Sequence, residues 1–197
     1  MLKAARWRLW TVLLSGLNIM LLGWLWLPAK LHLPKVTLTL HLLVPITTVY
    51  LLSLIAPFVL AKSYQWQRWQ VAMHWAIGWA AYSLAVVLLP GLFRTANQAA
   101  IGLGLVFGVA GLLCVDAPRN HTLGIRVPWT YQSPAIWRKT NTLGGWLFVA
   151  GGLLGIALSS LDVALTPVLM VGLALLSGGG AVGYAYWLAH RPPHHLI

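Results

Sequence analysis

The chain has 197 residues, of which 59% are hydrophobic and 8% are charged, and its mean hydropathy is +0.79. This composition leaves too little polar surface to cover a soluble globule, so it predicts an integral membrane protein. The formal net charge of +11 does not indicate direct nucleic-acid binding, because the Lys and Arg residues are scattered through short connectors rather than gathered on one arm or face.

Six apolar stretches are long enough, or nearly long enough, to cross a bilayer, which takes about twenty residues. They are residues 9–27, 36–60, 71–93, 99–115, 143–160 and 164–189. Long apolar runs favour helices over barrel strands, because a lone spanning segment must satisfy its backbone hydrogen bonds internally. We therefore predict an all-α integral membrane protein with a single domain, 1–197. Its six transmembrane helices carry a structured cytoplasmic loop, 116–142, between the fourth and the fifth.

The basic residues predict how these helices are oriented. If the connectors alternate between the two sides of the membrane, ten of the 13 Lys and Arg residues fall on one side, and Lys30, Lys35 and Arg94 fall on the other. The positive-inside rule then predicts a cell-membrane protein with the loop 116–142 and both termini in the cytoplasm.

Two histidines lie within or beside the predicted spans. His41 comes one turn before Pro45, and a histidine at that depth is a candidate for function. Its alternative role is a hydrogen bond to a neighbouring helix or to the carbonyl that Pro45 leaves unpaired. His74 lies near the predicted cytoplasmic interface and is a weaker candidate.

Glycines recur at four-residue spacing in the last three spans. The pairs are Gly104/Gly108, Gly151/Gly155 and Gly179/Gly183. This spacing lets helix backbones approach closely. Since all three helices carry it, packing of these helices against one another is favoured, and a homo-oligomer interface stays as the alternative.

The loop 116–142 is the longest polar interruption in the chain. Ile125, Val127 and Trp129 alternate with polar or proline positions, which predicts an extended segment at the membrane interface. Ser133 is predicted to cap a helix that continues through Trp137 and Asn141 into the fifth span. Four residues apart, those two side chains share one helix face.

The spacing of glycine, arginine, proline and tryptophan in this loop forms a motif. Its residues are Asn120, Leu123, Gly124, Ile125, Arg126, Val127, Pro128, Trp129, Thr130, Trp137 and Asn141. The motif resembles that of the SdpI family of multi-pass membrane proteins, with Val127 where the family usually has threonine. The resemblance implies immunity against a membrane-active antimicrobial peptide or bacteriocin. It also implies a signalling role in which a cytoplasmic repressor is held at the membrane.

We take eight of these residues as the candidate functional or partner-binding set, and we place its centre at Arg126, Trp129 and Trp137. The set is Asn120, Gly124, Arg126, Pro128, Trp129, Thr130, Trp137 and Asn141. Two interpretations stay open. The centre is either a docking surface for a peptide or a cytoplasmic protein, with arginine and aromatic anchors, or a membrane anchor in which Arg126 pairs with lipid phosphate.

An enzyme is not predicted, and neither is a metal ion or another cofactor. The two carboxylates, Asp116 and Asp162, fall on opposite sides of the predicted membrane, which excludes a paired-carboxylate mechanism. His121 is more typical of a loop contact than of a general base. The C-terminal histidines His190, His194 and His195 are typical of a flexible tail, with divalent-metal capture as the alternative.

The second function that fits the composition is a small transporter or exporter of peptide or lipid. The scarcity of charge within the spans argues against ion coupling through a relay of carboxylates.

Overall fold

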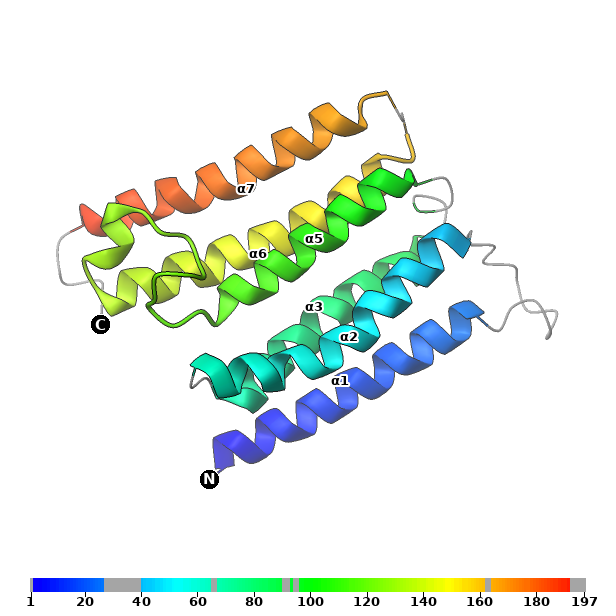
Figure 1. The fold of residues 1–197 in the computed structure, drawn as a ribbon, viewed down its shortest axis with the longest axis horizontal. Coiled ribbons are helices and arrows are strands. Elements are labelled where there is room, and N and C mark those ends of the chain that lie inside the picture. The colour runs from blue at the N-terminus through cyan, green and yellow to red at the C-terminus, as the bar shows by residue number, and fades with distance from the viewer. Residues whose placement is uncertain are drawn as a thin grey trace.

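The structure, a computed structural model, describes residues 2–26, 40–64, 67–89, 93, 96–161 and 164–191. Six long helices form the molecule (Figure 1): α1 (Leu2–Trp26), α2 (Leu40–Tyr64), α3 (Arg68–Leu88), α5 (Gln98–Val115), α6 (Pro134–Leu158) and α7 (Thr166–Ala189). The described residues contain no strand, and all six helices are long and apolar enough to cross a membrane. The predicted fold class is confirmed, and the protein is a multi-pass membrane protein.

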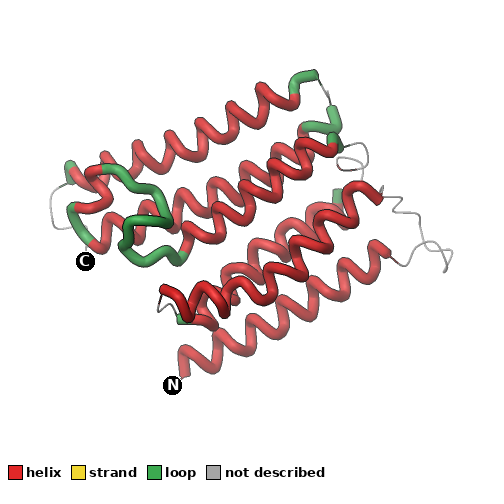
Figure 2. Tube along the Cα trace, in the orientation of Figure 1, coloured by secondary structure: helices red, strands yellow, loops and turns green. Residues whose placement is uncertain are grey.

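Consecutive helices run in opposite directions, so alternate connectors meet at one end of the bundle. Figure 2 shows the long connector between α5 and α6 at the same end as the start of α1, the end of α2, the start of α3 and the end of α7. We call this the loop end. Basic residues lie at this end: Arg6 is near the start of α1, Lys62 is in the last turn of α2, Arg126 is in the connector between α5 and α6, and Arg191 follows α7.

The bundle consists of two groups of three helices. In the first, α3 packs against α1 and α2, and in the second, α6 packs between α5 and α7. Helix α5 also contacts α2 and α3, so the two groups meet there. The core at this junction includes the fully buried Tyr82 of α3 and Ile101 of α5. Many large apolar side chains of α1, α2 and α7 are exposed, as expected for surfaces that face lipid.

Glycines allow α5 and α6 to touch along their backbones. A Cβ atom added to Gly111 would lie 2.4 Å from the carbonyl oxygen of Gly145. One added to Gly152 would lie 2.3 Å from that of Gly104. Only glycine permits such an approach.

The predicted glycine packing is therefore confirmed for two pairs and wrong for the third. Gly104 and Gly108 face neighbouring helices, and so do Gly151 and Gly155, whose added Cβ atoms would meet Ser177 and Met170 of α7. By contrast, Gly179 and Gly183 have no heavy atom within 4 Å of an added Cβ. Because both are on the outward side of α7, they take no part in packing within the chain.

The helix boundaries differ from the predicted spans mainly at α6, which begins at Pro134 rather than at residue 143. The reason is the cap: the Ser133 side chain accepts a hydrogen bond from the Ile136 amide at 3.1 Å, as the sequence predicted. Helix α2 continues through both of its prolines.

Several residues singled out in the sequence lie outside the described residues. They are Lys30, Lys35, Arg94, Asp162, His194, His195 and the side chain of His41.

Candidate functional site

The loop begins with a turn that one asparagine builds. The Asn120 side-chain oxygen accepts hydrogen bonds from the amides of Thr122 and Leu123, both at 2.7 Å. Its amide nitrogen donates to the carbonyl oxygen of Pro118 at 2.5 Å. Asparagine is favoured in such turns because its side chain imitates a backbone carbonyl. Asn120 therefore shapes the loop from within.

The next turn depends on Gly124 and Asn141. Gly124 has a φ of 105°, a conformation that side-chain-bearing residues rarely adopt. The Ile125 amide then donates to the Asn141 side-chain oxygen at 2.5 Å, and the Asn141 amide group donates to the Trp137 carbonyl at 3.0 Å. Asn141 is completely buried. Its one side chain thus joins the loop to the first turns of α6.

Trp137 supports the loop from beneath. Its side chain is buried, and its indole N–H donates to the carbonyl oxygen of Ala117 at 2.7 Å. Its ring also packs against Tyr131, with 5.3 Å between ring centroids. Trp137 and Asn141 share one face of α6, as their spacing predicted, and that face is turned inward.

A short 3₁₀ helix, η1 (Pro128–Tyr131), closes the loop. The buried Thr130 hydroxyl donates to the Val127 carbonyl at 2.8 Å and accepts from the Val127 amide at 3.2 Å. The predicted extended segment is therefore wrong from Pro128 onward. These bonds use only the backbone of Val127, so they do not require the threonine that is usual at this position of the motif.

The outer surface of the loop is basic and aromatic. We define the loop surface as Arg119, His121, Arg126 and Trp129. The Arg126 guanidinium donates to the His121 carbonyl, and the His121 ring stacks on Tyr131 with centroids 6.1 Å apart. The Arg119 guanidinium lies 5.6 Å from the centre of the same Tyr131 ring.

Trp129 connects the loop surface to α7. It is half-buried and meets Tyr186 edge to face, with 5.2 Å between centroids. Among the eight candidate residues, Arg126 and Trp129 thus reach outward, together with the exposed ring of Pro128. The other five hold the loop in shape.

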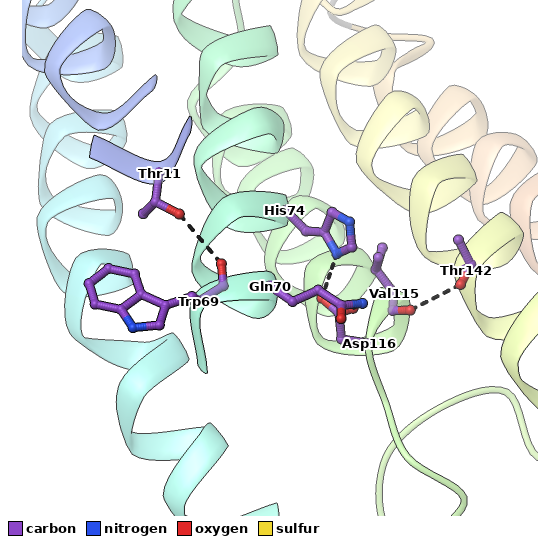
Figure 3. Close-up of polar contacts among 7 residues, drawn as sticks. All are labelled: Thr11, Trp69, Gln70, His74, Val115, Asp116 and Thr142. Atoms are coloured by element: carbon purple, nitrogen blue, oxygen red, sulfur yellow. Dashed lines mark hydrogen bonds and ion pairs between the residues drawn. The ribbon is translucent and has the colours of Figure 1, made fainter. Parts of the chain in front are cut away.

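A polar cluster missed by the sequence interpretation lies beside the start of the loop (Figure 3). The Nδ1 atom of His74 is 2.7 Å from one oxygen of Asp116, and the Gln70 side-chain amide donates to the other at 3.1 Å. The Asp116 side chain is only 7% exposed. Since Gln70 and His74 belong to α3 and Asp116 ends α5, the cluster joins the two groups of helices.

Two further contacts in Figure 3 extend this connection to other helices. The Thr142 hydroxyl of α6 donates to the Val115 carbonyl at 3.1 Å, and the Thr11 hydroxyl of α1 to the Trp69 carbonyl at 3.4 Å. The sequence indicates only that Gln70 and His74, four residues apart, lie on one helix face. Nothing local to α3 indicated that Asp116 would face them.

Within the part of the chain that the structure describes, no three His, Cys, Asp or Glu side chains gather where they could hold a metal ion. His190 packs against Tyr186, with ring centroids 4.1 Å apart.

Comparison with known proteins places the similarity in this same region. The SdpI/YfhL protein family matches residues 116–186, which cover the loop, α6 and most of α7. The immunity protein SdpI of Bacillus subtilis (strain 168) is 27% identical over 77 residues, a match that covers 39% of this chain and 37% of that relative. No solved structure matches. The family match begins at Asp116 and includes every residue of the loop motif, so the similarity to the SdpI family lies in the part of the chain that forms the loop, α6 and most of α7.

Proposed function

We propose that the chain is a membrane immunity protein, which protects a bacterial cell against a membrane-active antimicrobial peptide or bacteriocin. The observation that carries the proposal is that the family match, residues 116–186, includes the loop whose hydrogen bonds and ring contacts hold it against α6 and α7. The matching relative is itself named an immunity protein.

In this proposal the motif residues have two roles. Asn120, Gly124, Thr130, Trp137 and Asn141 position the loop through the hydrogen bonds described above. Arg126 and Trp129 are the contact groups. Arginine and tryptophan carry much of the binding energy in protein interfaces, because they combine a large contact area with directional donors. Arg119 adds a second cation to the same surface, which favours a partner with acidic groups.

The proposed orientation places the loop surface in the cytoplasm. A cytoplasmic regulator would meet that surface directly, whereas a peptide arriving from outside would meet it only after entering the bilayer. We therefore propose that the helices bind the peptide within the membrane, and that protection also depends on the loop surface, which holds a cytoplasmic regulator such as a repressor.

The test is protection in a sensitive bacterium. Cells that produce the chain and cells with an empty vector are challenged with a panel of cationic and hydrophobic antimicrobial peptides, and survivors are counted. Higher survival against at least one peptide is expected. Equal survival across the panel, with the chain detected in the membrane fraction, would contradict the proposal.

The same cells distinguish immunity by binding from the alternative, export of peptide or lipid. Protected cells are incubated with a fluorescently labelled form of the peptide. Binding or shielding within the membrane leaves the amount of cell-associated peptide unchanged or raised. Export lowers that amount, and the decrease disappears when the cells are de-energised.

A further inference from the structure

An open groove of about 410 Å³ lies at the loop end, beside the first turns of α6. Its lining consists of Arg138, Lys139, Thr142, Leu143, Trp146 and Tyr184. All of these belong to α6 except Tyr184, which comes from α7. The groove is separate from the loop surface, because none of its lining residues is a member of that surface.

The lining changes from cationic to apolar along α6. Arg138 is exposed, and the described residues offer its guanidinium no hydrogen bond or ion pair. Lys139 stands next to it. One turn further from the loop end, Leu143 is 37% exposed, and the half-buried Trp146 follows. By helical spacing Lys139, Leu143 and Trp146 lie on one face of α6, and the exposed Leu154 continues that face towards the other end.

Aromatic rings frame the groove near the loop end of the helices. Trp146 meets His74 of α3 edge to face, with centroids 6.1 Å apart. Tyr184 stacks on Trp187 at 5.5 Å, and the Arg191 guanidinium lies over Trp187. Tryptophan and tyrosine prefer the membrane interface, because their rings are apolar and their N–H or O–H groups are polar.

We propose that this groove binds an anionic phospholipid, with the phosphate at Arg138 and Lys139 and an acyl chain along Leu143 and Trp146. The order of cations followed by an apolar wall matches the order of headgroup and chain in a lipid. A free phosphate would leave the apolar wall unused, and a zwitterionic lipid carries its own cation beside its phosphate. Asp116, the carboxylate among the described residues, is already bonded to His74 and Gln70.

Binding at this place would stabilise the region that matches the family. Arg138 and Lys139 lie in the same turns of α6 as Trp137 and Asn141, which hold the loop. A ligand that binds only the folded form raises the stability of that form. The inference is independent of immunity, because it concerns lipid selection by α6 and α7 alone.

The experiment measures lipid binding to the purified, delipidated full chain in detergent. Phosphatidylglycerol, phosphatidylcholine and inorganic phosphate are titrated separately, and bound lipid is counted by native mass spectrometry alongside thermal melting. The variants are Arg138→Gln with Lys139→Gln, the charge-conserving Arg138→Lys, and Arg6→Gln as the matched control. Arg6 is also an exposed cation at the loop end, but it belongs to α1 and lines neither the groove nor the loop surface.

Wild type, Arg138→Lys and Arg6→Gln should prefer phosphatidylglycerol to phosphatidylcholine. Attraction to an anionic leaflet amounts to about fivefold in affinity for each Lys or Arg, so the double variant should lose most of this preference. Three results would each overturn the proposed site: no preference in wild type, equal loss in Arg6→Gln, or stabilisation of wild type by inorganic phosphate equal to that by phosphatidylglycerol. Since both substituted side chains project from the surface of α6, circular dichroism should show an unchanged helix content.

Discussion

Replacing Gly124 by alanine should release the loop from α6 while leaving the six helices intact. The added Cβ would lie 2.5 Å from the Asn141 side-chain oxygen and 3.0 Å from the Trp137 ring. That oxygen is the acceptor for the Ile125 amide, so a displaced Asn141 also loses this hydrogen bond. The single methyl group therefore acts on the contact that joins the loop to the bundle.

Two contributions determine the size of the effect. A positive φ costs a non-glycine residue roughly 1–2 kcal/mol. An unsatisfied donor or acceptor costs about 1–3 kcal/mol when it is buried. Together they should lower the free energy needed to open the loop by about 2–5 kcal/mol. The α5–α6 contact at Gly111 and Gly145 is unaffected.

Hydrogen–deuterium exchange measures this local opening directly. Because 2 kcal/mol corresponds to about a thirtyfold change in an equilibrium, amides of residues 120–131 should exchange at least that much faster in Gly124→Ala. The control is Gly183→Ala on α7, where an added Cβ meets no atom within 4 Å. Equal exchange of the loop in wild type and Gly124→Ala would refute the account of how Asn141 holds the loop.

Three other predictions concern the bundle and its orientation. Asp116→Ala removes the acceptor of Gln70 and the partner of His74, so the melting temperature should fall by an amount equivalent to about 1 kcal/mol per lost hydrogen bond. The melting temperature of Asp116→Asn should fall less. An unchanged melting temperature in Asp116→Ala would show that the cluster does not stabilise the contact between the helix groups. Gly152→Val forces side-chain atoms against the Gly104 carbonyl and should destabilise by roughly 1–3 kcal/mol or more, whereas Gly179→Val, which faces no neighbour, should melt like wild type. Thr122→Cys in a Cys114→Ser background should react with a membrane-impermeant maleimide only after cell lysis, and labelling of intact cells would reverse the proposed orientation.

Local patterns predicted the fold class, the cap of α6 and the common face of Trp137 and Asn141, because the relevant forces act along one helix or one turn. Six apolar runs predicted six helices, because a single segment that crosses a membrane must satisfy its backbone hydrogen bonds internally. Ser133 followed by Pro134 predicted the cap of α6, and the four-residue spacing of Trp137 and Asn141 predicted their common face. These features depend on neighbours in the sequence and need no knowledge of the partner helix.

The sequence was insufficient where a residue's role depends on a distant partner. The spacing of Gly179 and Gly183 is the same as that of Gly104 and Gly108, yet only the latter pair packs, because the two pairs face different surroundings. His74 lies 42 positions from Asp116 in the chain, so their contact had no local pattern. Trp137 and Trp129 are both tryptophans of one motif, and only the fold separates the buried support from the half-buried contact group.

The central proposal is that the protein binds its partner through the Arg126 and Trp129 side chains of the folded loop. Survival under a protective peptide challenge tests it with Arg126→Ala, Trp129→Ala and, as a matched control, Arg6→Ala, an exposed cation of α1 at the same end. Loss of an interface anchor lowers affinity by about tenfold or more, so both loop variants should lose most of the protection while Arg6→Ala keeps it. Full protection by both loop variants, at wild-type levels in the membrane, would contradict the claim.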